Sequence, residues 1–133
     1  MTREAIHSTL IDSLMRVFDD TDDISVIGTG ADELCVGRDA VKEMFLRNFS
    51  QATANEFEWD WVDTRISNNH AVTCVTFIIH LEYKGNQLEI PLRWTVVLKN
   101  ENDRWVWLHR HASTAASGQD DGQAYPKGKQ EKK

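Results

Sequence analysis

The second half of the chain, from Phe57 to Ser113, is the feature that most restricts its fold. Apolar and polar residues alternate there in four segments that are rich in β-branched and aromatic side chains. The segments span residues 57–67, 70–83, 88–99 and 104–113. The connections between them are short and contain Asn, Gly and Asp, which favour tight hairpins. We therefore expect four long antiparallel strands in a meander.

Two amphipathic segments precede these strands. Apolar residues recur at helical spacing between residues 5 and 18 and again within residues 37–51. Between them, "DISVIGTG" is a short β-prone run that ends in glycines. Because one sheet face is mostly apolar and needs cover, the sequence predicts an α+β fold with the helices packed on that face.

Composition limits the domain count and the class of partner. A chain of 133 residues with 41% hydrophobic residues suits one domain, over 1–113, followed by a polar tail, 114–133, that we expect to be disordered. A net charge of −6 without a basic patch argues against nucleic acid as a partner. The short apolar runs and the N-terminal composition predict no membrane partner and a cytoplasmic location. Cys35 and Cys74 are too few for a disulfide framework or a zinc module.

Assumed hairpin registers assign the strand residues to two faces. If the turns centre on Asn68-Asn69 and Gly85-Asn86, and Lys99 pairs with Trp105, one face is both aromatic and polar. It includes Trp59, Trp61, Arg93, Thr95, Trp107, His109 and His111. A broad surface of Trp, Arg and His is typical of a protein–protein interface, so we expect a homodimer through this face.

The helix-facing side contains one row that breaks the apolar pattern: Asp60, Phe77, Trp94 and Arg110. A carboxylate and a guanidinium at the two ends of an aromatic row are buried only with partners, so they either pair or line a cavity. These four residues are the candidate ligand site, and Asp60 and Arg110 are the candidate catalytic pair. The alternatives are a structural ion pair for Asp60 and a core role for Phe77 and Trp94.

The "HRH" segment raises the question of a metal site. A strand places His109 and His111 on one face, and His80 lies on the same face, so a three-histidine site is conceivable. The surrounding Trp and Arg residues supply no acidic ligand, and we therefore interpret these histidines as interface residues and expect neither a metal nor a cofactor. Asp32 and Glu33, which precede a helical segment, are interpreted as loop or capping groups.

The expected elements follow the order helix, short strand, helix and four strands, and the chain contains the segments "ISVIGTGADELCVGRDAV" and "RWTVV…RWVWLHRHAS". In these features, residues 4–113 resemble the SnoaL-like branch of the nuclear transport factor 2-like superfamily. The last strand is also similar to that of the association domain of calcium/calmodulin-dependent protein kinase II. The corresponding residues are Trp105, Leu108, His109, His111 and Ser113, with Leu108 in place of the family's Val. The resemblance implies a cone: a bent sheet around helices, a pocket at the open end, and dimers built on the outer sheet face.

The resemblance does not fix an activity, because this fold includes isomerases, cyclases, dehydratases and binding or scaffolding modules. Our preferred hypothesis is a homodimer that binds a small, partly apolar molecule with a carbonyl or carboxylate group. One alternative is a cyclase or isomerase in which Asp60 removes a proton and Arg110 stabilises the oxyanion. The other is an oligomerisation module with a vestigial pocket. The tyrosine and paired acids of ketosteroid isomerases have no counterpart, since the chain has only Tyr83 and Tyr125.

Overall fold

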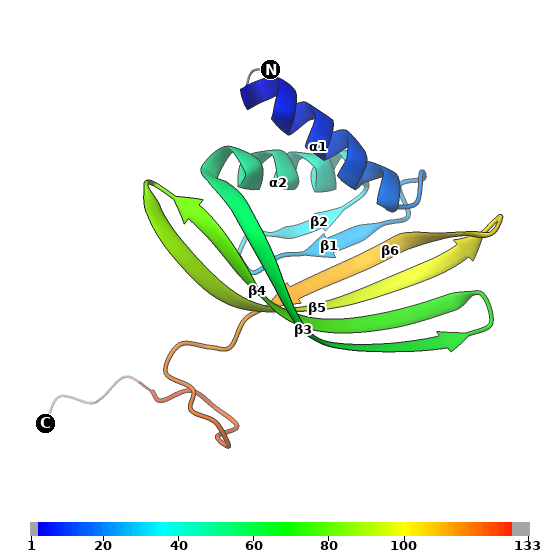
Figure 1. Ribbon diagram of the computed structural model, residues 1–133. Coiled ribbons are helices and arrows are strands. Elements are labelled where there is room, and N and C mark those ends of the chain that lie inside the picture. The colour runs from blue at the N-terminus through cyan, green and yellow to red at the C-terminus, as the bar shows by residue number, and fades with distance from the viewer. Residues whose placement is uncertain (1–2, 129–133) are drawn as a thin grey trace, which may run out of the picture.

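The computed structural model describes residues 3–128, with side chains from Thr9 onward. Two helices precede and interrupt a set of six strands (Figure 1). The elements are α1 (Arg3–Val17), β1 (Ser25–Ile27), β2 (Leu34–Val36), α2 (Arg38–Gln51), β3 (Ala52–Ser67), β4 (His70–Tyr83), β5 (Asn86–Glu101) and β6 (Arg104–Ser113). Among the described helices, none is long and apolar enough to cross a membrane.

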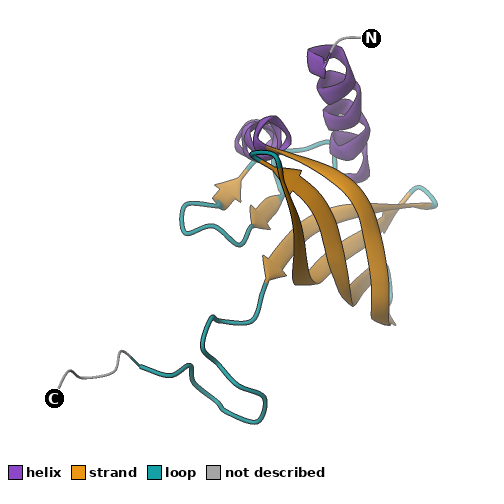
Figure 2. Ribbon diagram, turned by 60° about the vertical axis from the view of Figure 1, so that its left-hand side comes forward, coloured by secondary structure: helices purple, strands orange, loops and turns teal. Residues whose placement is uncertain are grey.

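The strands form one sheet in the order β2-β1-β6-β5-β4-β3. Strands β3 to β6 are the predicted antiparallel meander, while β1 pairs in parallel with β6 and β2 pairs with β1. The sheet bends strongly, and both helices lie over its concave side (Figures 1 and 2). The predicted α+β architecture is therefore confirmed, whereas β2 was not expected.

The main core lies between the helices and β1. Phe18, directly after α1, has its ring centroid 6.2 Å from that of Phe45 in α2 and 5.6 Å from that of Trp107 in β6. The buried residues of this cluster are Ile11, Met15, Phe18, Ile24, Val26, Val41, Met44 and Phe45. Arg38 donates hydrogen bonds to the carbonyl oxygens of Met15 and Asp19, which ties the start of α2 to the end of α1.

Two hairpin registers differ from those expected. The second turn uses Lys84 and Gly85, with φ angles of 51° and 78°, so β4 and β5 are offset by two residues from the prediction. The third turn is Asn102-Asp103, also with positive φ at both residues, rather than a longer loop. Positive φ at both central residues is the geometry of a two-residue hairpin whose twist matches that of the sheet. A two-residue offset changes the cross-strand neighbours and leaves each side chain on its expected face.

A β-bulge at Asp60 changes which face residues 56–59 of β3 present, and a further register shift lies between Ala54 and Glu56. Trp61 pairs with Thr76 and Trp59 pairs with Phe77, so Asp60 is an extra residue without a partner. One extra residue reverses the side-chain alternation on one side of the bulge. Trp59 therefore lies on the concave face with Phe77, and Asp60 lies on the outer face. The predicted faces of Trp59 and Asp60 are wrong for this reason.

A bulge in β6 has the same effect. Val97 pairs with His109 and Leu98 pairs with Trp107, which leaves Leu108 as the extra residue. Trp107 consequently faces the core, where it contacts Phe18, and not the outer face on which it was predicted. His109 and His111 keep their predicted outer positions.

The segment after β6 leaves the sheet on the side away from the helices (Figures 1 and 2). The hydroxyl of Thr114 donates a hydrogen bond of 2.8 Å to the carbonyl oxygen of Pro91. Beyond it, residues 115–128 form turns without a helix or strand, and the ammonium group of Lys127 lies 3.3 Å from a carboxylate oxygen of Asp120. The expected disorder of the tail stays a prediction, and residues 129–133 lie outside the described residues.

We expect Phe18→Ala to lower the free energy of unfolding by about 3–5 kcal/mol, because it removes the ring that joins α1, α2 and β6. The control is Leu34→Ala, on a short edge strand where the side chain is exposed. Urea denaturation of both variants is the measurement. Equal losses in the two variants would show that Phe18 is not a central packing residue.

Candidate functional site

The concave face of the sheet contains a continuous aromatic surface, here called the aromatic wall. It consists of Phe57, Trp59, Phe77, Trp94 and Trp107, from strands β3 to β6. The Phe57 and Phe77 rings are stacked, with centroids 5.6 Å apart and planes at 2°. The centroid of Phe77 lies 4.9 Å from that of Trp59 and 4.7 Å from that of Trp94. Trp94 continues to Trp107 at 6.1 Å.

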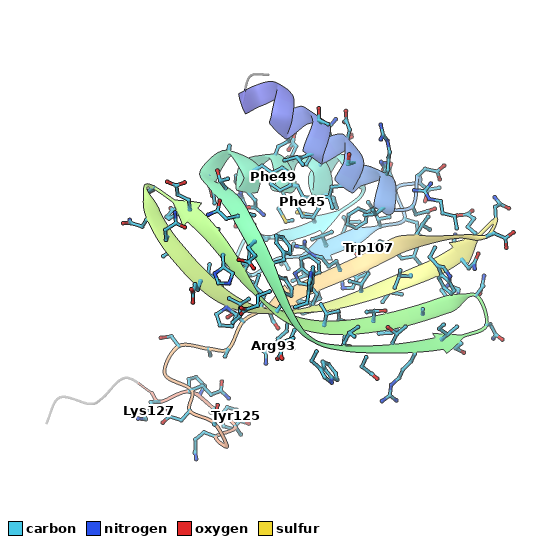
Figure 3. All side chains as sticks on the ribbon, in the orientation of Figure 1. Phe45, Phe49, Arg93, Trp107, Tyr125 and Lys127 are labelled. Carbon is cyan, nitrogen blue, oxygen red and sulfur yellow. The ribbon has the colours of Figure 1, made fainter. Side chains whose placement is uncertain are left out.

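The aromatic wall is closed at one end and open at the other. Phe77 is only 2% exposed, whereas Trp59 is 60% exposed. Trp59 belongs to β3, the edge strand of the sheet, and Val62 farther along that strand is also exposed. The helices therefore cover the inner part of the wall, near Trp107 (Figure 3), whereas the exposure of Trp59 shows that the part on β3 is accessible.

Arg110 lies at the covered end, between α2 and the sheet. Its guanidinium carbon is 5.0 Å from the ring centroids of both Phe45 and Trp94. These contacts are cation–π interactions, which suit a guanidinium better than an ammonium group. Arg110 is 8% exposed, and burial lowers its pKa to about 10, so the side chain still carries its charge at neutral pH.

Glu33 is a buried carboxylate close to Arg110 that the sequence reasoning treated as a loop or capping group. Its charge favours the protonated form of Arg110 and opposes the effect of burial on the pKa. One oxygen accepts a 2.8 Å hydrogen bond from the backbone N–H of Gly30, and the other lies 3.4 Å from Arg47. Arg47 also donates a 2.8 Å hydrogen bond to Asp32, which lowers the pKa of that carboxyl group.

The glycines of "GTGADE" explain how Glu33 is accommodated. A Cβ atom on Gly28 would lie 2.5 Å from Oε1 of Glu33, and one on Gly30 would lie 2.9 Å from it. The segment therefore closes around a side-chain carboxylate. Gly28 and Gly30 followed by the adjacent acids Asp32 and Glu33 are not a recognised motif, so the sequence offered no clear signal for the role of Glu33.

The structure does not bring Asp60 and Arg110 together. Asp60, displaced by the bulge, is exposed on the outer face and accepts a 3.4 Å hydrogen bond from the hydroxyl of Thr76. Phe77, Trp94 and Arg110 share the concave face as expected, and Trp59 occupies the place that was predicted for Asp60. The prediction that Asp60 and Arg110 share one face as a catalytic pair is therefore wrong.

The outer face keeps five of the seven residues predicted for it. Trp61, Arg93 and His111 are exposed, while Thr95 and His109 are partly buried. Figure 3 shows Arg93 on the side of the sheet opposite the helices. Arg93 donates a hydrogen bond to Ser113, and His109 contacts the hydroxyl of Ser25 at 2.8 Å. An open hollow of about 650 Å³ lies beside Arg93. Its lining includes Asp60, Thr76, Ile78, Pro91 and Arg93 of the outer face and also Trp59, Phe77 and Leu92, which belong to the concave face.

The histidines do not form a three-ligand arrangement. His109 and His111 have ring centroids 6.4 Å apart, and His80 pairs instead with Glu89, at 3.5 Å between Nδ1 and Oε1. Among residues 3–128, as far as they are described, no three His, Cys, Asp or Glu side chains gather closely enough to hold a metal ion.

With this geometry established, comparison with known proteins assigns the fold. A model of the family described as SnoaL-like domain matches residues 2–117. No curated protein shows significant similarity to the sequence. Many solved structures are similar, at identities that show the fold alone.

Three of these structures illustrate how differently proteins with this fold are described. A protein from Xanthomonas campestris, described as a calcium/calmodulin-dependent protein kinase II association domain, is 15% identical, with a TM-score of 0.71 over 86% of this chain and 81% of the other. A protein from Streptomyces avermitilis, described as a dehydratase from the nuclear transport factor 2-like family, is 16% identical, with a TM-score of 0.71 over 86% of this chain and 89% of the other. A ketosteroid isomerase-like protein from Erwinia carotovora is 17% identical, with a TM-score of 0.68 over 85% and 87%. The predicted cone fold is confirmed.

We expect Gly28→Ala to lower the free energy of unfolding by about 1–3 kcal/mol, because the new methyl group overlaps the Glu33 side chain. The matched control is Gly128→Ala, where an added Cβ meets no atom within 4 Å. Thermal or urea denaturation measures both. If Gly28→Ala is as stable as the control, the loop does not hold Glu33 as described.

Proposed function

The chain belongs to the SnoaL-like domain family, and we propose that it is a small-molecule-binding homodimer whose ligand lies against the aromatic wall. The observation that carries this proposal is the exposure of Trp59. This side chain is 60% exposed although it is on the helix-facing side and in contact with the buried Phe77. A residue that served the core alone would be buried, as Phe77 is.

The energetics of the aromatic wall favour a flat, partly apolar ligand. Large aromatic side chains offer roughly 150–250 Å² each, so a 60% exposed Trp59 presents on the order of 100 Å². Covering that area contributes about 2.5 kcal/mol at 25 cal/mol per Å², before any contact with Phe57 or Val62. A concave, mainly apolar surface with few polar groups is typical of small-molecule sites.

Relatives of this fold support a small-molecule role. Two of the similar structures are described as a dehydratase and as ketosteroid isomerase-like, and both names refer to reactions of small organic molecules. An enzymatic mechanism with Asp60 as base has no support from the geometry, because that side chain is on the outer face. We therefore propose binding, and no reaction.

The outer face supports the homodimer. Trp61 is 54% exposed there. An exposed surface that combines a large aromatic side chain with Arg and His has the composition of an interface. The proposal also includes a cytoplasmic location, which the two free thiols, Cys35 and Cys74, support.

Trp59 and Trp61 provide a matched pair that separates the two parts of this proposal, because both are exposed and they lie on opposite faces. We expect Trp59→Ala to weaken binding of the neutral fluorescent probe N-phenylnaphthylamine by about tenfold or more, and to leave the dimer intact. Probe titration by fluorescence is the measurement, with Trp61→Ala as the control that should bind the probe normally.

We expect Trp61→Ala, in turn, to weaken self-association, because it removes the largest apolar side chain exposed on the outer face. Light scattering at micromolar concentration should give about twice 15.3 kDa for the unaltered protein and for Trp59→Ala. A monomeric unaltered protein would contradict the dimer. A dimer that binds no probe would instead favour the oligomerisation module with a vestigial pocket.

A further inference from the structure

Two buried nitrogen atoms at the covered end of the aromatic wall lack hydrogen-bond partners. They are Nε of Arg110 and Nε1 of Trp94, which is partly buried. Within the described part of the chain, the Arg110 guanidinium donates no hydrogen bond and forms no ion pair; its contacts are the faces of Phe45 and Trp94. Buried donors are normally paired, and an unpaired charged donor is the most costly kind.

Glu33 does not supply the missing acceptor. Its oxygens contact the backbone N–H of Gly30 and the guanidinium of Arg47, and no ion pair joins it to Arg110. Its influence on Arg110 is a longer-range electrostatic one. Arg47 also pairs with Asp32, so these two acids are already engaged with another cation. Arg110 is therefore a buried cation next to a site that has no anion of its own.

We propose that the ligand of the aromatic wall is a planar aromatic or conjugated monocarboxylate, with its carboxylate at Arg110 and its ring system toward Trp59. This inference rests on the proposed function and adds the chemical class of the ligand. A carboxylate accepts charge-assisted hydrogen bonds from a guanidinium, and an indole N–H is a further donor for the same group.

The arrangement of the wall matches such a ligand. The Arg110 guanidinium lies 5.0 Å from the ring centroid of Trp94, and the exposed Trp59 ring lies 6.2 Å from that of Trp94. The charged group is thus at the covered end and the exposed ring at the open end. A flat molecule with one polar end can place that end at Arg110 and its ring at Trp59. An apolar molecule would leave Nε of Arg110 and Nε1 of Trp94 without a hydrogen-bond acceptor.

At neutral pH, Arg110 and a ligand carboxylate have opposite charges and can form an ion pair. Arg110 has a pKa of about 10 and stays protonated, and an aromatic carboxylic acid is ionised there. The neighbouring Glu33 carboxylate favours a ligand with one negative charge over a ligand with two, because like charges at close range repel each other. A neutral amide of the same shape keeps the ring contacts and loses the charge pairing.

The test is competition between naphthoate and naphthamide for the site occupied by N-phenylnaphthylamine, near neutral pH. These two compounds have the same ring system and differ in charge. We expect naphthoate to displace the probe at a concentration about tenfold lower than naphthamide. Equal displacement by the two compounds would overturn the inference, while probe binding itself would still support the proposed function. Absence of probe binding would overturn both.

Variants test whether Arg110 causes the preference for naphthoate over naphthamide. Arg110→Met should bind naphthoate and naphthamide equally, and Arg93→Met on the outer face should keep the full preference for naphthoate. Arg110→Lys keeps a positive charge without the planar donor set, and we expect a reduced preference. A loss of preference in Arg93→Met, or a full preference in Arg110→Met, would overturn the assignment. Should Arg110→Met fail to fold, the comparison of the two compounds on the unaltered protein and on Arg110→Lys decides.

Discussion

The alternation of side chains along β3, broken between Ala54 and Glu56 and again at Asp60, determines what the two faces of this protein present. Because successive strand residues point to opposite sides, one unpaired residue exchanges the faces of all residues on one side of it. Trp59 thereby joins Phe77 and Trp94 on the concave face. Trp61, two positions along the chain, stays on the outer face. Two adjacent tryptophans are thus assigned to two different surfaces, and both the proposed ligand site and the proposed interface depend on this exchange.

Arg110 connects the core to the aromatic wall. Its guanidinium lies between Phe45 of α2 and Trp94 of β5, so it contacts both the helix layer and the sheet. Aromatic faces offset part of the cost of burying the charge, but they accept no hydrogen bond at its Nε atom. The Glu33 carboxylate, held by Gly30 and Arg47, reduces the cost through its field without forming an ion pair. The result is a rigid, incompletely satisfied cation, which is more useful for binding than for stability.

Much of the fold follows from the sequence, and the details of the site do not. The alternation of apolar and polar residues predicted the bounds of β4 and β6, which are His70–Tyr83 and Arg104–Ser113. It also predicted that Phe77, Trp94 and Arg110 face the helices. The bulges were not predictable, because the pattern "FEWDWVDTRIS" alternates equally well with or without an extra residue at Asp60. Gly85 suits either position of a two-residue turn, so pattern alone did not select the register. Glu33 was missed because its role comes from packing against Gly28 and Gly30 rather than from a motif.

The central claim is that a ligand binds to the concave aromatic wall and not to the outer face. The chain has five tryptophans, and their indole N–H groups give separate nuclear magnetic resonance signals that report on both faces. We predict that titration with naphthoate shifts the signals of Trp59 and Trp94 and leaves that of Trp61 unchanged. A shift confined to Trp61, or no shift in any of the five, would contradict the account.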